Sequence, residues 1–374
     1  MITLVGIGLI GFGLLLVQKY VYEKIWQKHL HVTVRFGTGH IFEGGQGELK
    51  EVVENKKRLP LSMLKVKFKT DRHLLFDQEK GSRTTDQFYR NDIFRIGGGE
   101  RVTRTLKFQG GRRGYYTIDE VSLVASDLFL LSQLVADVEV KTELYVYPRP
   151  FDSARLRKSL VQINGEILSR RHLLEDPFEY RGIREYQPYD DMRSINWKAT
   201  ARTGDLKVNQ KNYTALKSVR VFFQIQDDNI LKKDSAVEMS LRIVAALCLF
   251  FLRQGIQVSC HGNGVDIVTG HPVSVRAKAG AGQMDTIYRA LARVDVERPA
   301  ADFREHFEEI LFRNGKGSFT FFVAPNQYDD FTELLNRYRE EGNSFVWYYP
   351  VCGRTEPELP PELAKAVEVI HFEE

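Results

Sequence analysis

The first seventeen residues carry no charged side chain, and this limits what the N-terminal part of the chain can fold into. Met1 to Val17 is long enough to cross a bilayer, because a membrane helix needs about 17–25 apolar residues. The four glycines in this run weaken a helix in water but are tolerated in a membrane. We therefore expect a membrane anchor helix over residues 1–28; a buried core helix is the alternative.

Positive charge follows the apolar run, at Lys19, Lys24 and Lys28. The positive-inside rule then predicts a single-pass protein of the cell membrane with its soluble domains in the cytoplasm. No basic segment precedes the run and no small-residue cleavage motif follows it, so we expect the helix to be retained. The cysteines are three, without a C-x-x-C pair, which agrees with a reducing compartment.

Short runs of alternating apolar and polar residues follow, as is typical of strands. The runs are HVTVRF, GELKEVVEN, LSMLKVKFKT, RVTRTLKF, YYTIDEVSLVAS and KTELYVYP. Glycines, including the triplet Gly97 to Gly99, separate them as turns. Residues 29–150 are therefore predicted to form an antiparallel β-sandwich of the immunoglobulin type.

Strand and helix patterns alternate in the C-terminal part, residues 216–374. Predicted strands are SVRVFFQI, IQVSCHG, SFTFFVA and SFVWYYP, with a hairpin-like VDIVTGHPVSVRA; predicted helices are 234–254, 282–294, 301–312 and 328–341. This alternation predicts a mostly parallel sheet with helices on both faces. Residues 151–215 would connect the two domains, beginning with an exposed helix over Phe151 to Ser169.

Composition argues against two classes of partner. The net charge of +4 is small and the basic residues are mixed with acidic ones, so nucleic-acid binding is not expected. The nine histidines show no H-E-x-x-H or paired metal spacing. We expect no zinc site and no cofactor.

One segment, GIREYQPYDDMRSINWKATARTGDLKVN from Gly182 to Asn209, mixes charged and aromatic residues densely. Pro188 favours a turn over Gln187 to Asp191, in which Asp190 and Asp191 accept backbone N–H groups. A short helix over Met192 to Arg202 is predicted after it. The aromatic side chains, Tyr186, Tyr189 and Trp197, are expected to be partly buried.

This segment resembles the signature of a bacterial family called domain of unknown function 58. The matching residues are Gly182, Arg184, Tyr186, Pro188, Asp190, Asp191, Arg193, Ile195, Trp197, Lys198 and Ala201. Tyr189 stands where the family commonly has Gly. Upstream, GGRRGYY and SDLFLL are similar to two further family elements, with Leu128 and Leu130 replacing the usual Pro and Gly, so a smoother turn is expected there.

The resemblance implies an α+β multidomain protein with a transmembrane helix, an immunoglobulin-like β-sandwich and an α/β doubly wound domain similar to a von Willebrand factor A domain. Family members often have two adjacent membrane spans, whereas one is visible here. A domain of the A type binds a divalent ion through an Asp-x-Ser-x-Ser run, because carboxylates and hydroxyls are hard oxygen ligands. The corresponding run here begins at Gln226 and leaves only Asp227 and Asp228 as candidate ligands. We therefore expect no metal, with a degenerate ion site as the alternative.

Asp190 and Asp191 are the one pair that invites a catalytic interpretation, since adjacent carboxylates can have different pKa values. No nucleophile and base accompany them, and no Gly-x-Ser-x-Gly element occurs. We expect a salt-bridged turn with Arg184, Arg193 or Arg202 as the partner, and no catalytic residue. The alternative is a hydrolytic enzyme that uses Asp190 or Asp191 with Arg193.

The predicted function is therefore that of a non-enzymatic, membrane-anchored cytoplasmic scaffold or adaptor that binds protein partners. The family resemblance implies a MoxR-type AAA+ ATPase as the partner, in envelope-related or complex-assembly processes. The signature would then serve as a brace between domains or as a surface for the partner. A module whose protein binding depends on a divalent ion is the second alternative.

Overall fold

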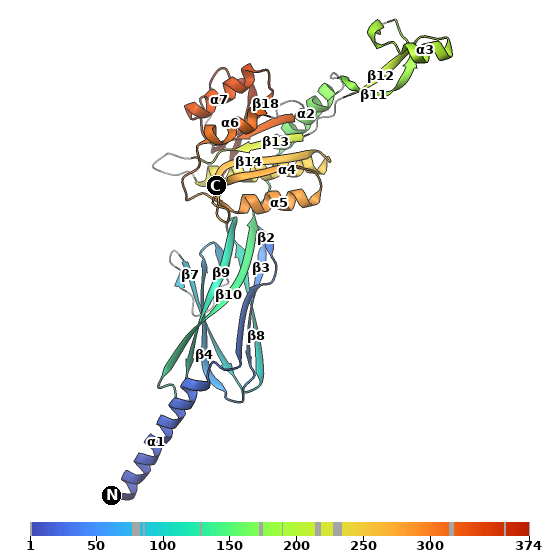
Figure 1. Cartoon of the computed structure of the whole chain (residues 1–374). Coiled ribbons are helices and arrows are strands. Elements are labelled where there is room, and N and C mark those ends of the chain that lie inside the picture. Colours follow the sequence, from blue (N-terminus) through green and yellow to red (C-terminus); the bar gives the residue numbers. More distant parts are fainter. Residues whose placement is uncertain are drawn as a thin grey trace. The chain divides into compact units, whose positions relative to one another are not determined.

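The computed structural model divides into two compact units, Met1–Arg149 and Pro150–Glu374 (Figure 1). The structure describes residues 2–76, 83–84, 87–127, 129–171, 175–188, 190–213, 218–226, 234–313, 318–354 and 357–373.

The first unit begins with a long helix, α1 (Ile2–Ile25), that has no charged residue before Lys19. Eight large side chains of this helix are 53–69% exposed: Ile7, Leu9, Ile10, Phe12, Leu14, Leu16, Val17 and Tyr20. Only its end is covered: Tyr22 and Trp26 are buried in the core of the sandwich, and the Tyr22 hydroxyl donates a hydrogen bond to the carbonyl of Pro60. The helix is thus fixed to the β domain at its C-terminal end, whereas most of its described surface before Gln18 is exposed.

One helix in the described part of the chain is long and apolar enough to cross a membrane, and it is α4 (Asp234–Arg253) in the second unit. Its most apolar stretch is 67% buried, as expected for a core helix. Over its described residues, α1 does not meet the same requirement of length and apolar composition; the side chains of residues 1–5 are not described. The transmembrane role of α1 therefore stays a prediction.

Two packed sheets form the rest of this unit. The four-stranded sheet has the order β1 (Leu30–Phe36), β3 (Gln46–Asn55), β8 (Glu100–Gly110), β5 (Leu74–Phe76). The six-stranded sheet has the order β2 (His40–Phe42), β10 (Gln133–Tyr147), β9 (Gly114–Ser126), β4 (Leu61–Asp71), β7 (Gln87–Ile96), β6 (Arg83–Thr84). Alternate residues of each strand, such as Val32, Val34 and Leu49, point into one core between the sheets.

The six alternating runs are all strands, as predicted, but the sequence pattern missed others. The short strands β2 and β5 and the strand β7 had no clear alternation, and β10 begins at Gln133, eight residues before the predicted KTELYVYP run. The prediction of a purely antiparallel sandwich is also wrong at one edge, where β2 pairs with β10 in parallel.

The turn between β9 and β10 is sharper than expected. Leu130 adopts a left-handed conformation with φ of 59°, and the Asp127 carboxylate accepts hydrogen bonds from the N–H groups of Leu131 (2.7 Å) and Ser132 (3.1 Å). The expected smoother turn is therefore wrong, because the Asp127 side chain closes the loop without a glycine. Leu128 lies outside the described residues.

The second unit is built on a sheet with the order β15 (Pro272–Lys278), β14 (Gln257–Asp266), β13 (Ser218–Phe223), β17 (Ser318–Val323), β18 (Phe345–Cys352), β19 (Val367–Phe372). β16 (Val294–Asp295) pairs with β14 beside it. The strands from β14 to β19 are parallel and β15 is antiparallel. The predicted mostly parallel sheet is therefore confirmed.

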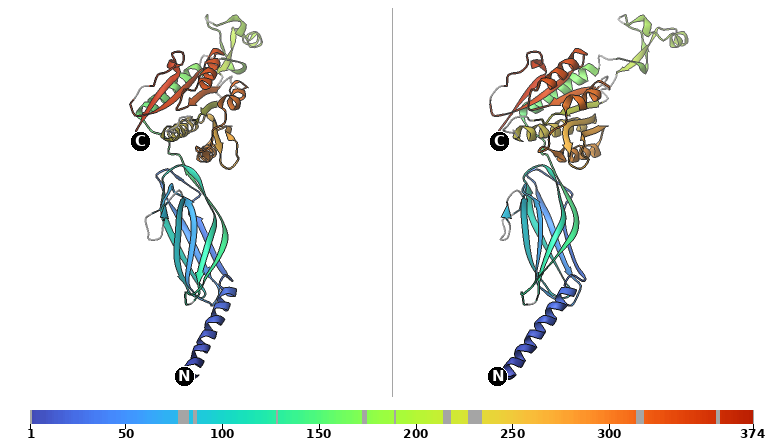
Figure 2. Two further views of the ribbon diagram at one scale, coloured as in Figure 1. Left: turned by 90° about the vertical axis from the view of Figure 1, so that its left-hand side faces the viewer. Right: turned by 60° about the vertical axis from the view of Figure 1, so that its left-hand side comes forward.

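Helices cover both faces of this sheet, so its strands are buried on both sides (Figure 2). Helices α6 (Phe303–Arg313) and α7 (Asp329–Glu340) pack on the face that carries Phe222 and Phe322. Helix α4 packs on the other face, where Phe251 contacts Phe321, and α5 (Ala281–Ala292) packs against α4.

The helix predicted over Phe151 to Ser169 exists as α2 (Ala154–Arg171), but it is not exposed as expected. Leu156, Leu160 and Ile163 are buried, and the Ser159 hydroxyl lies 2.9 Å from the hydroxyl of Tyr348. These residues recur every three or four positions and form one apolar face, which packs within the second unit. Residues 151–171 therefore belong to this unit.

The three cysteines are free, in agreement with the sequence. Cys248 on α4 is fully buried, as expected of a core residue, and Cys260 on β14 is buried as well.

Candidate functional site

The signature residues lie on a small antiparallel hairpin formed by β11 (Glu175–Glu185) and β12 (Lys207–Tyr213). A short 3-10 helix, η1 (Met192–Ser194), and a helix, α3 (Trp197–Thr203), fill the connection between these strands. Two backbone hydrogen bonds, from Tyr186 N–H to the Leu206 carbonyl (2.9 Å) and from Asn196 N–H to the Lys207 carbonyl (2.8 Å), hold the connection to β12. The signature is thus a compact folded element.

Asp190 is held by two kinds of donor. The Arg184 guanidinium donates to both Asp190 carboxylate oxygens, each at 2.6 Å, and the Gln187 N–H donates to Oδ2 at 2.8 Å. The hydrogen bonds from Arg184 lower the pKa of Asp190, so the carboxylate stays ionised at neutral pH. This is the salt-bridged turn that the sequence predicts, with Arg184 as the partner.

Asp191 caps the following helix. Its Oδ1 accepts a hydrogen bond from the Arg193 N–H at 3.0 Å, and its carbonyl accepts one from the Ser194 hydroxyl at 2.5 Å. Asp191 thus bonds the Arg193 backbone, and the described contacts include no ion pair between either aspartate and the guanidinium of Arg193 or Arg202. Both carboxylates therefore serve the local fold.

The single helix predicted over Met192 to Arg202 is interrupted. Ile195 forms a bridge with Val208 of β12, and Asn196 then caps α3 by accepting from the Ala199 N–H at 3.0 Å. Ile195 and Val208 are both buried, so the apolar contact between the connection and the hairpin breaks the helix. Gly204, in the left-handed conformation, ends α3.

Three polar residues outside the predicted set complete this element. The Asn196 side chain donates to Oδ1 of Asn209 at 2.6 Å, and the Thr200 hydroxyl accepts from the Lys207 N–H at 3.0 Å. An Asn before a short helix and a Gly after it are cap signals that mark α3 in the sequence. The pairing with β12 has no such local signal.

Large apolar side chains of this element face solvent. Trp197 is 65% exposed and Met192 68%, and Ile183 and Leu206 are also exposed. The expected partial burial of Trp197, the first residue of α3, is therefore wrong. Tyr186 is half-buried as expected, and Tyr189 lies outside the described residues. Arg193, Lys198, Ala201 and Arg202 are exposed beside these residues.

The candidate ion ligands Asp227 and Asp228 lie outside the described residues. Next to them, the Asn326 side chain donates a hydrogen bond to the Gln226 carbonyl, which joins the ends of β13 and β17. Among the described residues, no three His, Cys, Asp or Glu side chains are grouped so that they could hold a metal.

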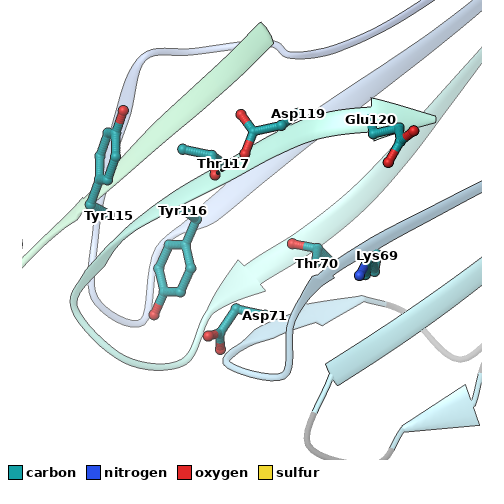
Figure 3. A pocket seen from close by; sticks show the side chains of 8 residues that line it. All are labelled: Lys69, Thr70, Asp71, Tyr115, Tyr116, Thr117, Asp119 and Glu120. Atoms are coloured by element: carbon teal, nitrogen blue, oxygen red, sulfur yellow. Dashed lines mark hydrogen bonds between the residues drawn. The ribbon is translucent and has the colours of Figure 1, made fainter. Parts of the chain in front are cut away.

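A separate opening lies in the six-stranded sheet of the first unit (Figure 3). Strands β4 and β9 pair only between Met63–Ser126 and Lys67–Ser122, and beyond these pairs they diverge. The opening has a volume of about 370 Å³ and is lined by Lys69, Thr70, Asp71, Tyr115, Tyr116, Thr117, Asp119 and Glu120.

The side chains in this opening are mostly engaged with their neighbours. Asp71 accepts from the His73 N–H at 2.8 Å, Asp119 accepts from the Thr117 hydroxyl at 3.1 Å, and the Tyr115 hydroxyl donates to Glu143 at 2.7 Å. Burial and this contact with Glu143 raise the pKa of Tyr115, which stays protonated. Neither Asp190 nor Asp191 belongs to this lining.

A family model matches the signature and part of the chain after it. Residues 182–362 match the family described as "Protein of unknown function DUF58". The match begins at Gly182, the first signature residue, and extends through the parallel strands to the loop before β19. It thus supports the resemblance over the signature and most of the α/β domain.

No curated protein matches the chain. A non-cellulosomal cohesin of Archaeoglobus fulgidus is 12% identical with a TM-score of 0.22, covering 31% of this chain and 90% of its own. A cohesin of Acetivibrio cellulolyticus scaffoldin B is 11% identical with a TM-score of 0.23, covering 31% and 98%. A CARDB domain of Pyrococcus furiosus is 16% identical with a TM-score of 0.20, covering 31% and 90%. Likeness at these scores supports no functional statement.

Proposed function

We propose that this chain is a non-enzymatic, membrane-anchored cytoplasmic scaffold that binds a protein partner through the signature element, with a MoxR-type AAA+ ATPase as the partner. One observation carries the proposal: the signature carboxylates stabilise the local fold, whereas Trp197 and Met192 are exposed. Exposed aromatic and Met side chains beside Arg are typical of protein-binding surfaces.

The hydrolytic alternative requires a free carboxylate with a place for substrate. Asp190 accepts three hydrogen bonds from Arg184 and Gln187, and its lowered pKa makes it a poor proton acceptor. The scaffold proposal is therefore preferred. The ion-dependent alternative is tested separately, by calorimetric titration of the full chain with magnesium and calcium; binding heat that Asp227→Asn removes would support it.

We also propose that α1 is the anchor and that the α/β domain is of the von Willebrand A type. A helix with large exposed apolar side chains buries its surface best in lipid. The strand order of the second unit, with helices on both faces, is consistent with an A-type domain. Membrane fractionation with carbonate extraction tests the anchor, and protease accessibility of the soluble part in inverted and right-side-out vesicles tests its orientation.

Binding measurements with the purified ATPase test the partner. We expect the full chain in lipid nanodiscs to bind, and Trp197→Ala to raise the Kd about 30-fold, which corresponds to the ~2 kcal/mol typical of an aromatic interface residue. The matched control is Val161→Ala, an equally exposed apolar residue on α2. Unchanged affinity for both Trp197→Ala and Met192→Ala would exclude this surface, and no binding at low salt would exclude the partner.

A further inference from the structure

An exposed apolar loop lies at the end of the sandwich from which α1 emerges. The loop joins β9 to β10, and its residues Phe129, Leu130 and Leu131 are 59%, 58% and 70% exposed. Three consecutive large apolar side chains in solvent are unusual for a turn, which is normally polar. Their exposure suggests a surface that is covered in the working protein.

The strand register places this loop beside α1. Leu30, which follows α1, pairs with Asn55, and the Asn55 side chain bonds the Leu59 carbonyl in the next connection. That connection leads into β4, where Met63 pairs with Ser126 immediately before the loop. Figures 1 and 2 show the β9–β10 turn and α1 at the same end of the domain. We call this the α1 end, formed by residues 23–30, 54–61, 96–101, 126–127 and 129–133.

Positive charge predominates at the α1 end. Its ranges contain six Lys and Arg residues against four Asp and Glu residues. Among these, Lys57 and Asp127 are buried. The exposed cations are Lys24, Lys28, Lys56, Arg58 and Arg101, against the anions Glu23, Glu54 and Glu100, and Lys56 forms an ion pair with Glu54 at 3.6 Å. Apolar side chains together with cations are the combination that binds anionic lipid surfaces.

We propose that the α1 end of the sandwich lies on the membrane surface, with Phe129, Leu130 and Leu131 inserted among lipid headgroups and Arg58 facing anionic lipids. The proposal rests on α1 being the anchor, because an anchor brings this end to the bilayer. It adds that the first domain is held against the membrane at a second point. The loop backbone is closed by Asp127, so the apolar residues are presented on a fixed turn.

Depth-dependent fluorescence quenching tests the proposal on the full chain in nanodiscs with a nitroxide-labelled lipid. In a Cys352→Ser background, with the other two cysteines buried, a bimane label is placed by Phe129→Cys, Phe12→Cys or Leu75→Cys. Leu75 is similarly exposed but lies at the opposite end, where it pairs with Gln109, and serves as the matched control. Phe12 reports on the anchor itself.

We expect labels at 129 and 12 to be quenched at least fivefold more than the label at 75. Quenching at 129 should increase when anionic lipid replaces neutral lipid. Arg58→Gln should lower the affinity for the anionic surface about fivefold, as expected from one lost cation, and so reduce this increase. Quenching at 12 without quenching at 129 would overturn the loop proposal and leave the anchor intact. Absence of quenching at both positions would overturn the anchor as well.

A protein partner covering the loop would give a different result. The label at 129 would then be shielded from aqueous iodide without being quenched by lipid nitroxide, which would overturn the proposal. Leu131→Cys provides a second label at the same loop, so that a perturbation specific to residue 129 does not decide the outcome.

Discussion

The guanidinium of Arg184 and the carboxylate of Asp190 face each other with two N–O distances of 2.6 Å. This bidentate geometry needs the planar fork of Arg, which a Lys ammonium cannot reproduce. The pair closes the turn between β11 and η1, and therefore controls how Met192 and Trp197 are presented. The signature residues are in this way divided into those that build the element and those that face outward.

Arg184→Lys is expected to loosen the signature element, because it removes one of the two guanidinium bonds and leaves Asp190 with weaker partners. Hydrogen exchange at Gln187 and Ile195 should become faster. Arg193→Lys, at an exposed position that donates to Asp191 only through its backbone, is the control and should leave exchange unchanged. Equal protection in both variants would contradict a structural role for the pair.

The signature element should lose the stabilisation from Asp190 only at acidic pH. The folded pKa of Asp190 is lower than its unfolded value, so its stabilising contribution is fully present above the unfolded pKa and is lost as pH falls through the lowered folded pKa. Exchange at Gln187 in the wild type is therefore expected to stay slow down to mildly acidic pH. In Asp190→Asn this pH dependence should be absent, and a wild type that loosens at neutral pH would contradict the assignment.

Glu51 is fully buried in the core of the sandwich, beside Asp92, which Arg90 and Arg104 hold at 2.6 Å each. Burial, and then the charge of Asp92, raise the pKa of Glu51 to about 8, although Arg104 and Arg90 oppose this. The folded state thus keeps a proton that the unfolded state loses above its pKa of about 4.5. The stability of the sandwich should therefore fall as pH rises from 5 to 8.

Glu51→Gln should abolish this fall, since Gln does not titrate. At pH 8 the variant is expected to be more stable than the wild type by about 1–3 kcal/mol, and at pH 5 the two should be similar. Denaturant unfolding followed by Trp26 fluorescence, in a Trp197→Phe and Trp347→Phe background, reports on the sandwich. Glu48→Gln, exposed on the same strand, is the control; parallel pH curves for wild type and Glu51→Gln would contradict the prediction.

Lys57 is 8% exposed, and desolvation lowers its pKa to about 8. Because the unfolded state holds the proton up to about pH 10.5, the folded state should gain stability as pH rises from 8 to 10.5. Lys57→Met should remove this gain and should be more stable than the wild type at pH 7 by about 1–2 kcal/mol. Lys56→Met, exposed next to it, should show neither effect in the same unfolding measurement.

Leu130 has a left-handed backbone that costs a non-glycine residue about 1 kcal/mol. Leu130→Gly should therefore stabilise the sandwich by about 0.5–1 kcal/mol, even though glycine adds entropy to the unfolded chain. Leu131→Gly, at a neighbouring position without positive φ, should destabilise by a similar amount. Thermal unfolding of both variants checks the sign, and destabilisation by both would show that the Leu130 conformation is not strained.

The local pattern of apolar and polar residues determined much of this protein. Runs such as LSMLKVKFKT are strands because every second side chain meets the core, and residues 234–253 form a helix because their apolar residues recur at helical spacing. The turn at Asp190 and Asp191 was also predictable, since Pro and Asp act through their immediate neighbours.

Tertiary structure decided what depends on partners distant in sequence. Val208 is separated from Ile195 by α3, yet their contact splits the predicted helix. β2 is too short for a periodic signal and is a strand only because β10 lies beside it. Whether Trp197 is buried and which Arg binds Asp190 depend on chain folding in three dimensions. Periodicity encodes which side of an element is apolar, but not which element covers it.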